Sequence, residues 1–262
     1  MNHYLLVPIG FAAGILAGYL GIGGGGIFVP VLFFCFSGLC SAELVPKLSV
    51  GTSTGAVLLT GLSGAFRHWQ LGHIDLSFFL RISAGALVGA FFGGLVVCHL
   101  PADILRIVIG IVLFIAAFRM VTYAKRDDSS FNERKPWWLV PIGVVVGLIA
   151  ATVGIGGGIL AVPILAGILG LNTKRAAGTS AAMTVVLSVG AIVGHILWGQ
   201  GVPGRPPGSF GFVVIADSLI LGIPAAAGAA IGAGLHRKFE PNIFRVVFAL
   251  LLVAVGIKII FF

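Results

Sequence analysis

The sequence predicts an all-α integral membrane protein made of two inverted repeats of four apolar segments. The first segment of each repeat is expected to break at a glycine-rich turn into a returning pair of helices. Three observations lead to this prediction: the composition, a duplicated glycine motif and the distribution of basic residues among the loops. Hydrophobic residues make up 58% of the chain and charged residues only 9%, whereas a soluble domain carries about 25% charged residues. There is too little polar sequence to cover a soluble globule.

The glycine motif occurs once in each half of the chain. LGIGGGGIFVP at residues 20–30 returns as VGIGGGILAVP at residues 153–163, and residues 8–32 and 141–165 share 13 of 25 positions. The repeat continues further along the chain, where Gly51-Thr52-Ser53 matches Gly178-Thr179-Ser180 and His68 matches His195. Glycine runs lose much backbone freedom on ordering, so two copies at matching places indicate a duplicated fold with a purposeful break in each half.

Eight apolar segments follow one another along the chain. They span residues 4–39, 43–66, 76–98, 101–123, 137–170, 175–198, 210–234 and 239–262. One clearly polar interval, residues 124–136, separates a first repeat at residues 1–123 from a second repeat at residues 137–262.

The first and fifth segments are too long for one simple crossing, which needs about 20 residues. Each contains its glycine run and a proline, Pro30 or Pro163, and proline disrupts a helix interior. Each segment is therefore either one over-long crossing or two shorter helical arms that enter and return.

The loop charges favour the returning arms. If both segments turn back, nine basic residues collect on one side of the membrane and two on the other. The nine are Arg67, Lys125, Arg126, Arg134, Lys135, Lys174, Arg175, Arg237 and Lys238, and the two are Lys47 and Arg205. The positive-inside rule then places the central loop in the cytoplasm and both termini outside. With an odd number of passes per half, the halves are inverted. The net charge of +8 is thus interpreted as topology-setting, and no nucleic acid partner is expected.

The two glycine turns are candidate anion sites. Irregular backbone at membrane depth must be buried in protein or line a wet cavity, and glycine amides at a helix N-terminus can converge on an anion. The candidate substrate-binding glycines are Gly21, Gly23, Gly24, Gly25, Gly154, Gly156, Gly157 and Gly158. The alternative is that these glycines only let helices approach closely.

Hydroxyl groups follow each turn. Thr52, Ser53, Thr179 and Ser180 could contact the substrate, or could bond back to carbonyls of their own helix. Gly51-Thr52-Ser53-Thr54-Gly55 also spells the GxSxG pattern of serine hydrolases, with His68 as a base. That pattern requires a strand-to-helix turn in an α/β sheet, which this sequence lacks, so an enzyme is not expected.

A few charged or titratable residues complete the candidate site. Arg67 could bind a sulfonate or carboxylate through two hydrogen bonds. His68, His195 and Asp217 are candidates for coupling transport to protons, because histidine titrates near neutral pH and intramembrane charge is costly. The histidines could equally be interfacial, and Asp217 could cap a helix end. No metal or other cofactor is expected.

With these motifs the chain resembles the sulfite exporter TauE/SafE family along essentially its whole length, most specifically at GIGGGGIFVP and GIGGGILAVP. The resemblance implies transport of small sulfur-containing or carboxylated anions across the bacterial inner membrane. Because no ATP-binding motif is present, we expect a secondary transporter working by alternating access. An anion channel is the main alternative, and a homodimer is an open alternative to a monomer.

Overall fold

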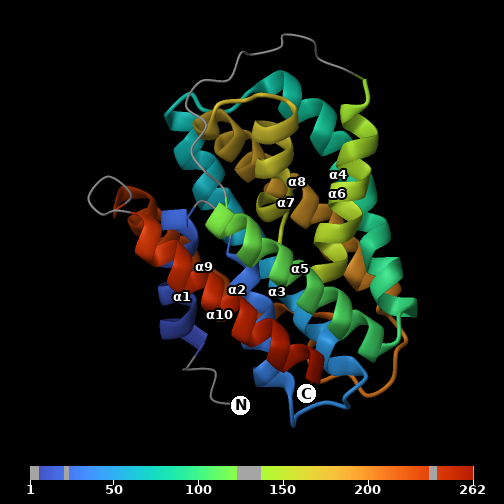
Figure 1. Ribbon diagram of the computed structural model, residues 1–262. Helices are drawn as coiled ribbons and strands as arrows, with labels where there is room; N and C mark the ends of the chain where they lie inside the picture. Colours follow the sequence, from blue (N-terminus) through green and yellow to red (C-terminus); the bar gives the residue numbers. More distant parts are fainter. Residues whose placement is uncertain (1–5, 21–23, 123–136, 236–240, 262) are drawn as a thin grey trace.

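A computed structural model describes residues 6–20, 24–122, 137–235 and 241–261 as helices joined by short loops, with one small two-stranded ribbon (Figure 1). The first half contains α1 (Leu6–Leu20), α2 (Gly25–Phe36), α3 (Leu44–Gln70), α4 (Leu76–His99) and α5 (Ala102–Thr122). The second half contains α6 (Leu139–Val153), α7 (Gly158–Pro163), the π-helical turn η2 (Ile164–Ile168), α8 (Thr173–Trp198), β1 (Ser209–Phe210), β2 (Val213–Val214), α9 (Ile215–Leu235) and α10 (Pro241–Phe261). The fold is all-α, as the sequence predicts.

Several of these helices have the length and composition of membrane spans. Within the described residues, three apolar stretches are long enough to cross a bilayer: Leu76–His99, Lys174–Trp198 and Ile215–Gly232. The helices on either side of the glycine motifs are also apolar but shorter, at 10–17 residues. Short arms are what two broken segments should produce.

The helices end and restart at the glycine motifs. Helix α1 ends at Leu20 and α2 begins at Gly25, while α6 ends at Val153 and α7 begins at Gly158. In the second turn Gly154 has φ +71° and Gly156 has φ +77°, a left-handed conformation that glycine adopts without strain. These backbone angles stop α6 and redirect the chain.

The two arms that follow the turns differ in regularity. Helix α2 continues past Pro30 to Phe36. Helix α7 ends at Pro163 and passes into the π-helical turn η2. Proline removes one backbone hydrogen bond, and π-turns inside helices are frequent at functional sites.

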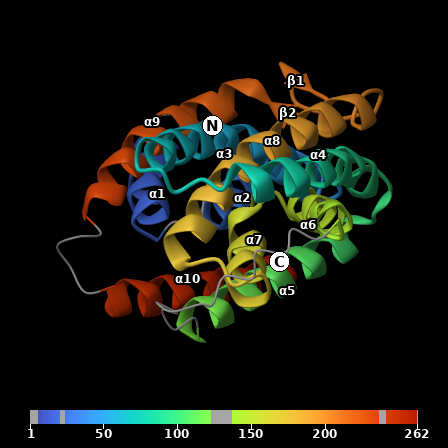
Figure 2. The same cartoon turned by 90° about the horizontal axis from the view of Figure 1, so that it is seen from above.

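Helix packing follows one pattern twice. Helix α1 packs along α9 and α6 along α4, while α3 contacts α9 and α8 contacts α4. Two further pairs join matching helices of the two halves, α3 with α8 and α5 with α10. Figures 1 and 2 both show α5 and α10 side by side, and Figure 2 shows them along the lower edge of the molecule.

Glycines allow the closest of these contacts. Along α1, glycines at every fourth position face carbonyls at every fourth position of α9; the pairs are Gly10 with Leu221, Gly14 with Ala225 and Gly18 with Ala229. From pair to pair, the residue numbers rise along both helices, so α1 and α9 run parallel. The matching pairs between α6 and α4 are Gly143 with Ile82 and Gly147 with Ala86. Small residues at such crossings let membrane helices pack backbone to backbone.

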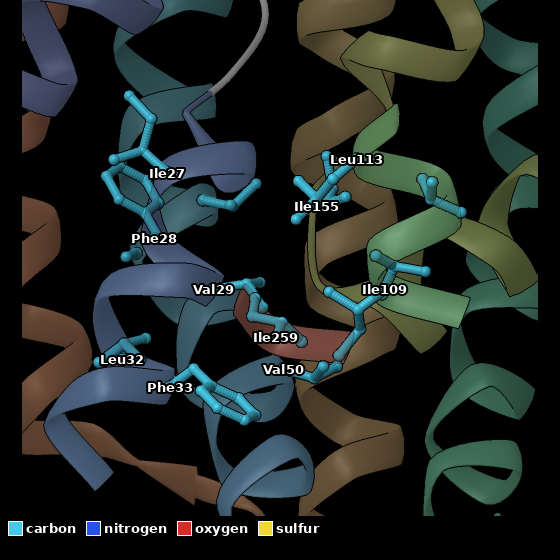
Figure 3. Packing of buried hydrophobic residues seen from close by; sticks show 14 of the residues in the cluster. Ile27, Phe28, Val29, Leu32, Phe33, Val50, Ile109, Leu113, Ile155 and Ile259 are labelled. Carbon is cyan, nitrogen blue, oxygen red and sulfur yellow. The ribbon is translucent and has the colours of Figure 1, made fainter. Parts of the chain in front are cut away.

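The larger hydrophobic cluster surrounds α2. Figure 3 shows its residues from α2 together with Val50 of α3, Ile109 and Leu113 of α5, Ile259 of α10 and Ile155 of the second glycine turn. The second turn is therefore part of the packed interior.

One segment differs from its predicted structure. Residues 210–214 fall in the seventh apolar segment, but they form the ribbon β1–β2 with Ser209 paired to Val214 and Phe210 to Val213. Gly208 precedes this ribbon and Gly211 lies in the turn between its strands, with φ of +78° and +57°, so helix α9 can begin only after them, at Ile215.

Candidate functional site

The second glycine turn is held against α3 by a serine. The Ser53 hydroxyl lies 2.8 Å from the Gly154 carbonyl and 2.7 Å from the Val50 carbonyl of its own helix. Both carbonyls can only accept, so the single hydroxyl proton is shared between them. Ser53 thus combines back-bonding within α3 with a contact to the turn.

The two glycine motifs meet at the centre of the molecule. A Cβ at Gly25 would overlap the backbone of Ile155, and a Cβ at Gly156 would lie 2.7 Å from Val57 of α3. Gly24, Gly25, Gly154, Gly156, Gly157 and Gly158 belong to the described turns, whereas Gly21 and Gly23 lie outside the described residues. The described part of the predicted glycine site is therefore brought together.

The two threonines of the repeated Gly-Thr-Ser motif make matching contacts. The backbone N–H of Val214 donates to the Thr52 hydroxyl at 3.1 Å, and that of Asp75 donates to the Thr179 hydroxyl at 3.0 Å. Asp75 is the N-cap of α4, and Val214 immediately precedes α9. Each threonine therefore fixes the start of a long helix.

Removing either hydroxyl should destabilise the protein. Valine has the same shape but cannot accept, so Thr52→Val and Thr179→Val should each lower the free energy of unfolding by about 1–3 kcal/mol. Thermal unfolding of the detergent-solubilised protein measures this. Thr54 is the matched control, because its hydroxyl bonds only to the Gly51 carbonyl of its own helix. If Thr54→Val cost as much as the other two, the anchoring role would be wrong.

Ser180 differs from its repeat partner Ser53. It is 1% exposed, and its hydroxyl has no hydrogen-bond partner among the described residues. Buried polar groups are nearly always hydrogen-bonded. The Ser180 hydroxyl is therefore the one of the four predicted hydroxyls that could gain its first hydrogen bond from a ligand.

The two repeated histidines have different environments. His195 is fully buried, and its Nε2 lies 3.2 Å from the Ala151 carbonyl. His68 is half-buried near the end of α3, with its Nδ1 3.3 Å from the Nδ1 of His73. The structure does not place these histidines together.

The two predicted charged residues lie apart from each other. Arg67 is exposed in the last turn of α3, with a 3.3 Å bond to Gln70. It is about four helical turns from Ser53, so it does not join the glycine turns in this conformation. Asp217 is 2% exposed in the first turn of α9, next to Ser218, which donates to the Thr52 carbonyl at 2.8 Å.

Comparison with known proteins identifies the family. The sulfite exporter TauE/SafE family matches residues 6–259. The chain belongs to this family.

Curated relatives of this TauE/SafE family member are named as transporters. A probable membrane transporter protein of Haemophilus influenzae is 30% identical over 257 residues, covering 97% of this chain and 96% of the relative. Probable membrane transporter protein MJ0441 of Methanocaldococcus jannaschii is 31% identical over 254 residues, covering 97% and 93%. No solved structure matches the chain. Its apolar helices and its family together make it a membrane transporter protein.

Sequence reasoning missed two features of this TauE/SafE member. Lys47 is only 7% exposed, and its ammonium donates to the Cys98 carbonyl at 3.0 Å. Helix α8 also buries the hydroxyls of Thr184 and Ser188. The spacing Ser180, Thr184, Ser188 could have revealed the second feature, because residues four apart share one helix face.

Acidification should loosen the loop between α3 and α4 in this TauE/SafE member. Burial, and secondly the positive charge of Lys174, lower the pKa of His73. The unfolded chain therefore binds a proton at His73 more readily than the folded protein does. The free energy of unfolding is highest above the unfolded pKa of about 6.5 and decreases as the pH falls. We expect His73→Gln to weaken the drop in unfolding temperature between about pH 7.5 and about pH 5.5. The exposed His99 is the control, and an equal effect of His99→Gln would contradict the assignment.

Proposed function

We propose that the protein is a secondary transporter that moves a small organic or sulfur-containing anion across the bacterial inner membrane by alternating access. The observation that carries this proposal is the meeting of two glycine-interrupted helix breaks at the centre of a membrane transporter. Discontinuous helices at a repeat interface commonly form the substrate site of secondary transporters.

The direction of matching helices supports an inverted repeat. Gly61 of α3 faces Thr184 and Val185 of α8, whereas Gly64 faces Ala181. The α8 number falls as the α3 number rises, so these two helices run antiparallel. They carry the matching Gly-Thr-Ser motifs. Equivalent helices that run in opposite directions are what inversion requires.

A second pair of matching helices behaves in the same way. Gly110 of α5 faces Ile260 of α10, and Gly256 of α10 faces Phe114 of α5. The residue numbers along α5 rise as those along α10 fall, so these two helices are also antiparallel. The twofold repetition of the Thr52 and Thr179 contacts agrees with this relation.

The direction of α2 supports a returning arm. Helix α3 runs parallel to α9, since Gly51 faces Phe212 and Gly55 faces Ser218, and α1 also runs parallel to α9. Gly25, the first residue of α2, meets the second glycine turn beside the middle of α3. The end of α2 leads through a short loop to the start of α3. Helix α2 thus runs in the direction opposite to α1, as a returning arm requires. With returning arms, the distribution of basic residues among the loops favours a cytoplasmic central loop.

We assign the substrate to the backbone of both turns and to nearby hydroxyls. The amides of the second turn and the unpartnered Ser180 hydroxyl are donors suited to an oxyanion. Thr52 and Thr179 shape this region by fixing α9 and α4. Arg67 and His68, near the end of α3, are assigned to attraction and coupling away from the glycine turns. His195, whose Nε2 faces the Ala151 carbonyl near the second turn, and Asp217 at the start of α9 are assigned to coupling.

A ligand screen on the purified protein tests the proposal. Sulfite, sulfate, sulfoacetate, taurine and simple carboxylates should be compared by their shift of the unfolding temperature, and the anion that binds should then enter proteoliposomes with saturable kinetics. Binding of none of these anions would overturn the substrate class. Uptake that does not saturate would indicate an anion channel instead.

A further inference from the structure

One face of α8 is polar along its buried length. Ser180, Thr184 and Ser188 are spaced by four residues and are each no more than 1% exposed. His195 follows seven residues after Ser188, which is about two helical turns, so it shares the same face. The corresponding positions of α3 include Val57 and Gly61, so α8 alone carries this row.

Three polar atoms of this row have no hydrogen-bond partner in the part of the chain that the structure describes. They are the hydroxyl oxygens of Ser180 and Ser188 and the Nδ1 of His195. The other nitrogen of His195 faces the Ala151 carbonyl, which can only accept. Nε2 therefore carries the proton, and Nδ1 presents a bare lone pair to the protein interior. Three such atoms within one membrane helix are costly unless water or a solute reaches them.

The row faces the interface between the two halves. The Thr184 methyl lies 3.4 Å from the position of a Cβ on Gly61 of α3, and the Thr184 hydroxyl lies 3.5 Å from that of a Cβ on Gly157. At Thr184 the polar face of α8 thus looks onto α3 and onto the second glycine turn, whereas at His195 it faces Ala151 of α6. Other faces of α8 are apolar, with Val189 exposed and Ala182 buried.

We propose that this face of α8 is the wall of the path taken by the transported anion, with water molecules occupying it when the anion is absent. This inference rests on the proposed function and adds Ser188 and Thr184 to the residues that the anion passes. Hydroxyls supply the donors for an anion, and the bare nitrogen of His195 accepts from water at one end of the row. The backbone of α3 opposite, with Gly61 at the crossing, leaves room for the passage to open.

Cysteine labelling tests the path without knowledge of the substrate. In protein whose native Cys35, Cys40 and Cys98 are replaced by alanine, Ser188→Cys should react with a membrane-impermeant, sulfonate-bearing methanethiosulfonate reagent. Two variants on other faces of α8 are matched controls. Val189→Cys replaces an apolar residue that is 45% exposed, and Ala182→Cys replaces a buried apolar residue. Both controls should fail to react, because lipid and packed core exclude a charged reagent.

The outcomes separate the path from the transport function. Modification of Ser188→Cys alone, slowed by the anion that the screen identifies, supports the path. No modification of Ser188→Cys in protein that still takes up the anion overturns it, as does equal modification of Ala182→Cys. Modification of Ser188→Cys in native-like protein that binds and transports none of the anions supports a hydrated path and overturns the proposed anion transport.

Discussion

Gly14→Ala and Gly147→Ala should each destabilise the protein severely. A Cβ at Gly14 would overlap the backbone of Ala225, and a Cβ at Gly147 would overlap that of Ala86. Backbone atoms cannot move aside as the end of a flexible side chain can, so α1 must separate from α9, or α6 from α4. We expect a loss of more than about 3 kcal/mol in the free energy of unfolding, at the upper end of overpacking effects. Thermal unfolding and the yield of monodisperse protein in detergent measure it.

The same substitution elsewhere provides the control. A Cβ at Gly64 would lie 3.9 Å from the Ala181 methyl, which is an ordinary contact. Gly64→Ala should therefore leave stability unchanged or raise it slightly, since alanine favours helix over glycine. Equal losses for Gly14→Ala and Gly64→Ala would mean that glycine serves general flexibility and not close packing.

Ser180→Ala should weaken anion binding without harming the fold, whereas Ser53→Ala should lower the stability of the protein. The Ser180 hydroxyl has no partner to lose, so its removal costs little stability. If it donates to the anion, its loss should weaken binding about tenfold or more, as expected for a hydrogen bond to a charged group. Ser53→Ala leaves the Gly154 carbonyl without its 2.8 Å donor and should cost about 1–3 kcal/mol of stability.

Calorimetric titration with the anion from the screen and thermal unfolding of both variants distinguish these effects. Unchanged affinity in Ser180→Ala would remove this hydroxyl from the binding site. A variant of Ser53 that is as stable as the parent would show that the turn is held by its glycine conformations alone.

The sequence is informative about this fold wherever backbone chemistry dominates. The glycine runs with Pro30 and Pro163 predict the helix breaks, because few other reasons exist for such residues in apolar segments. It is less informative where partners come from distant elements. Ser53 and Ser180 occupy equal places in the repeat, yet only Ser53 reaches a carbonyl, that of Gly154 101 residues away. No local pattern encodes that difference.

Residues near helix ends are hard to place for a similar reason. Lys47 and Arg67 both lie near ends of α3, but Lys47 is buried against Cys98 and Arg67 is exposed. The length of these side chains lets them reach either protein or water. The ribbon after Gly208 also escapes prediction, since its two-residue strands are too short to produce an alternating pattern.

The contact between Gly25 and Ile155 has a mechanical consequence. The start of α2 and the turn after α6 pack backbone to backbone with no side chain between them. Neither arm can therefore move toward the other without displacing it. In a protein that works by alternating access, this contact would pass a push on one arm directly to the other.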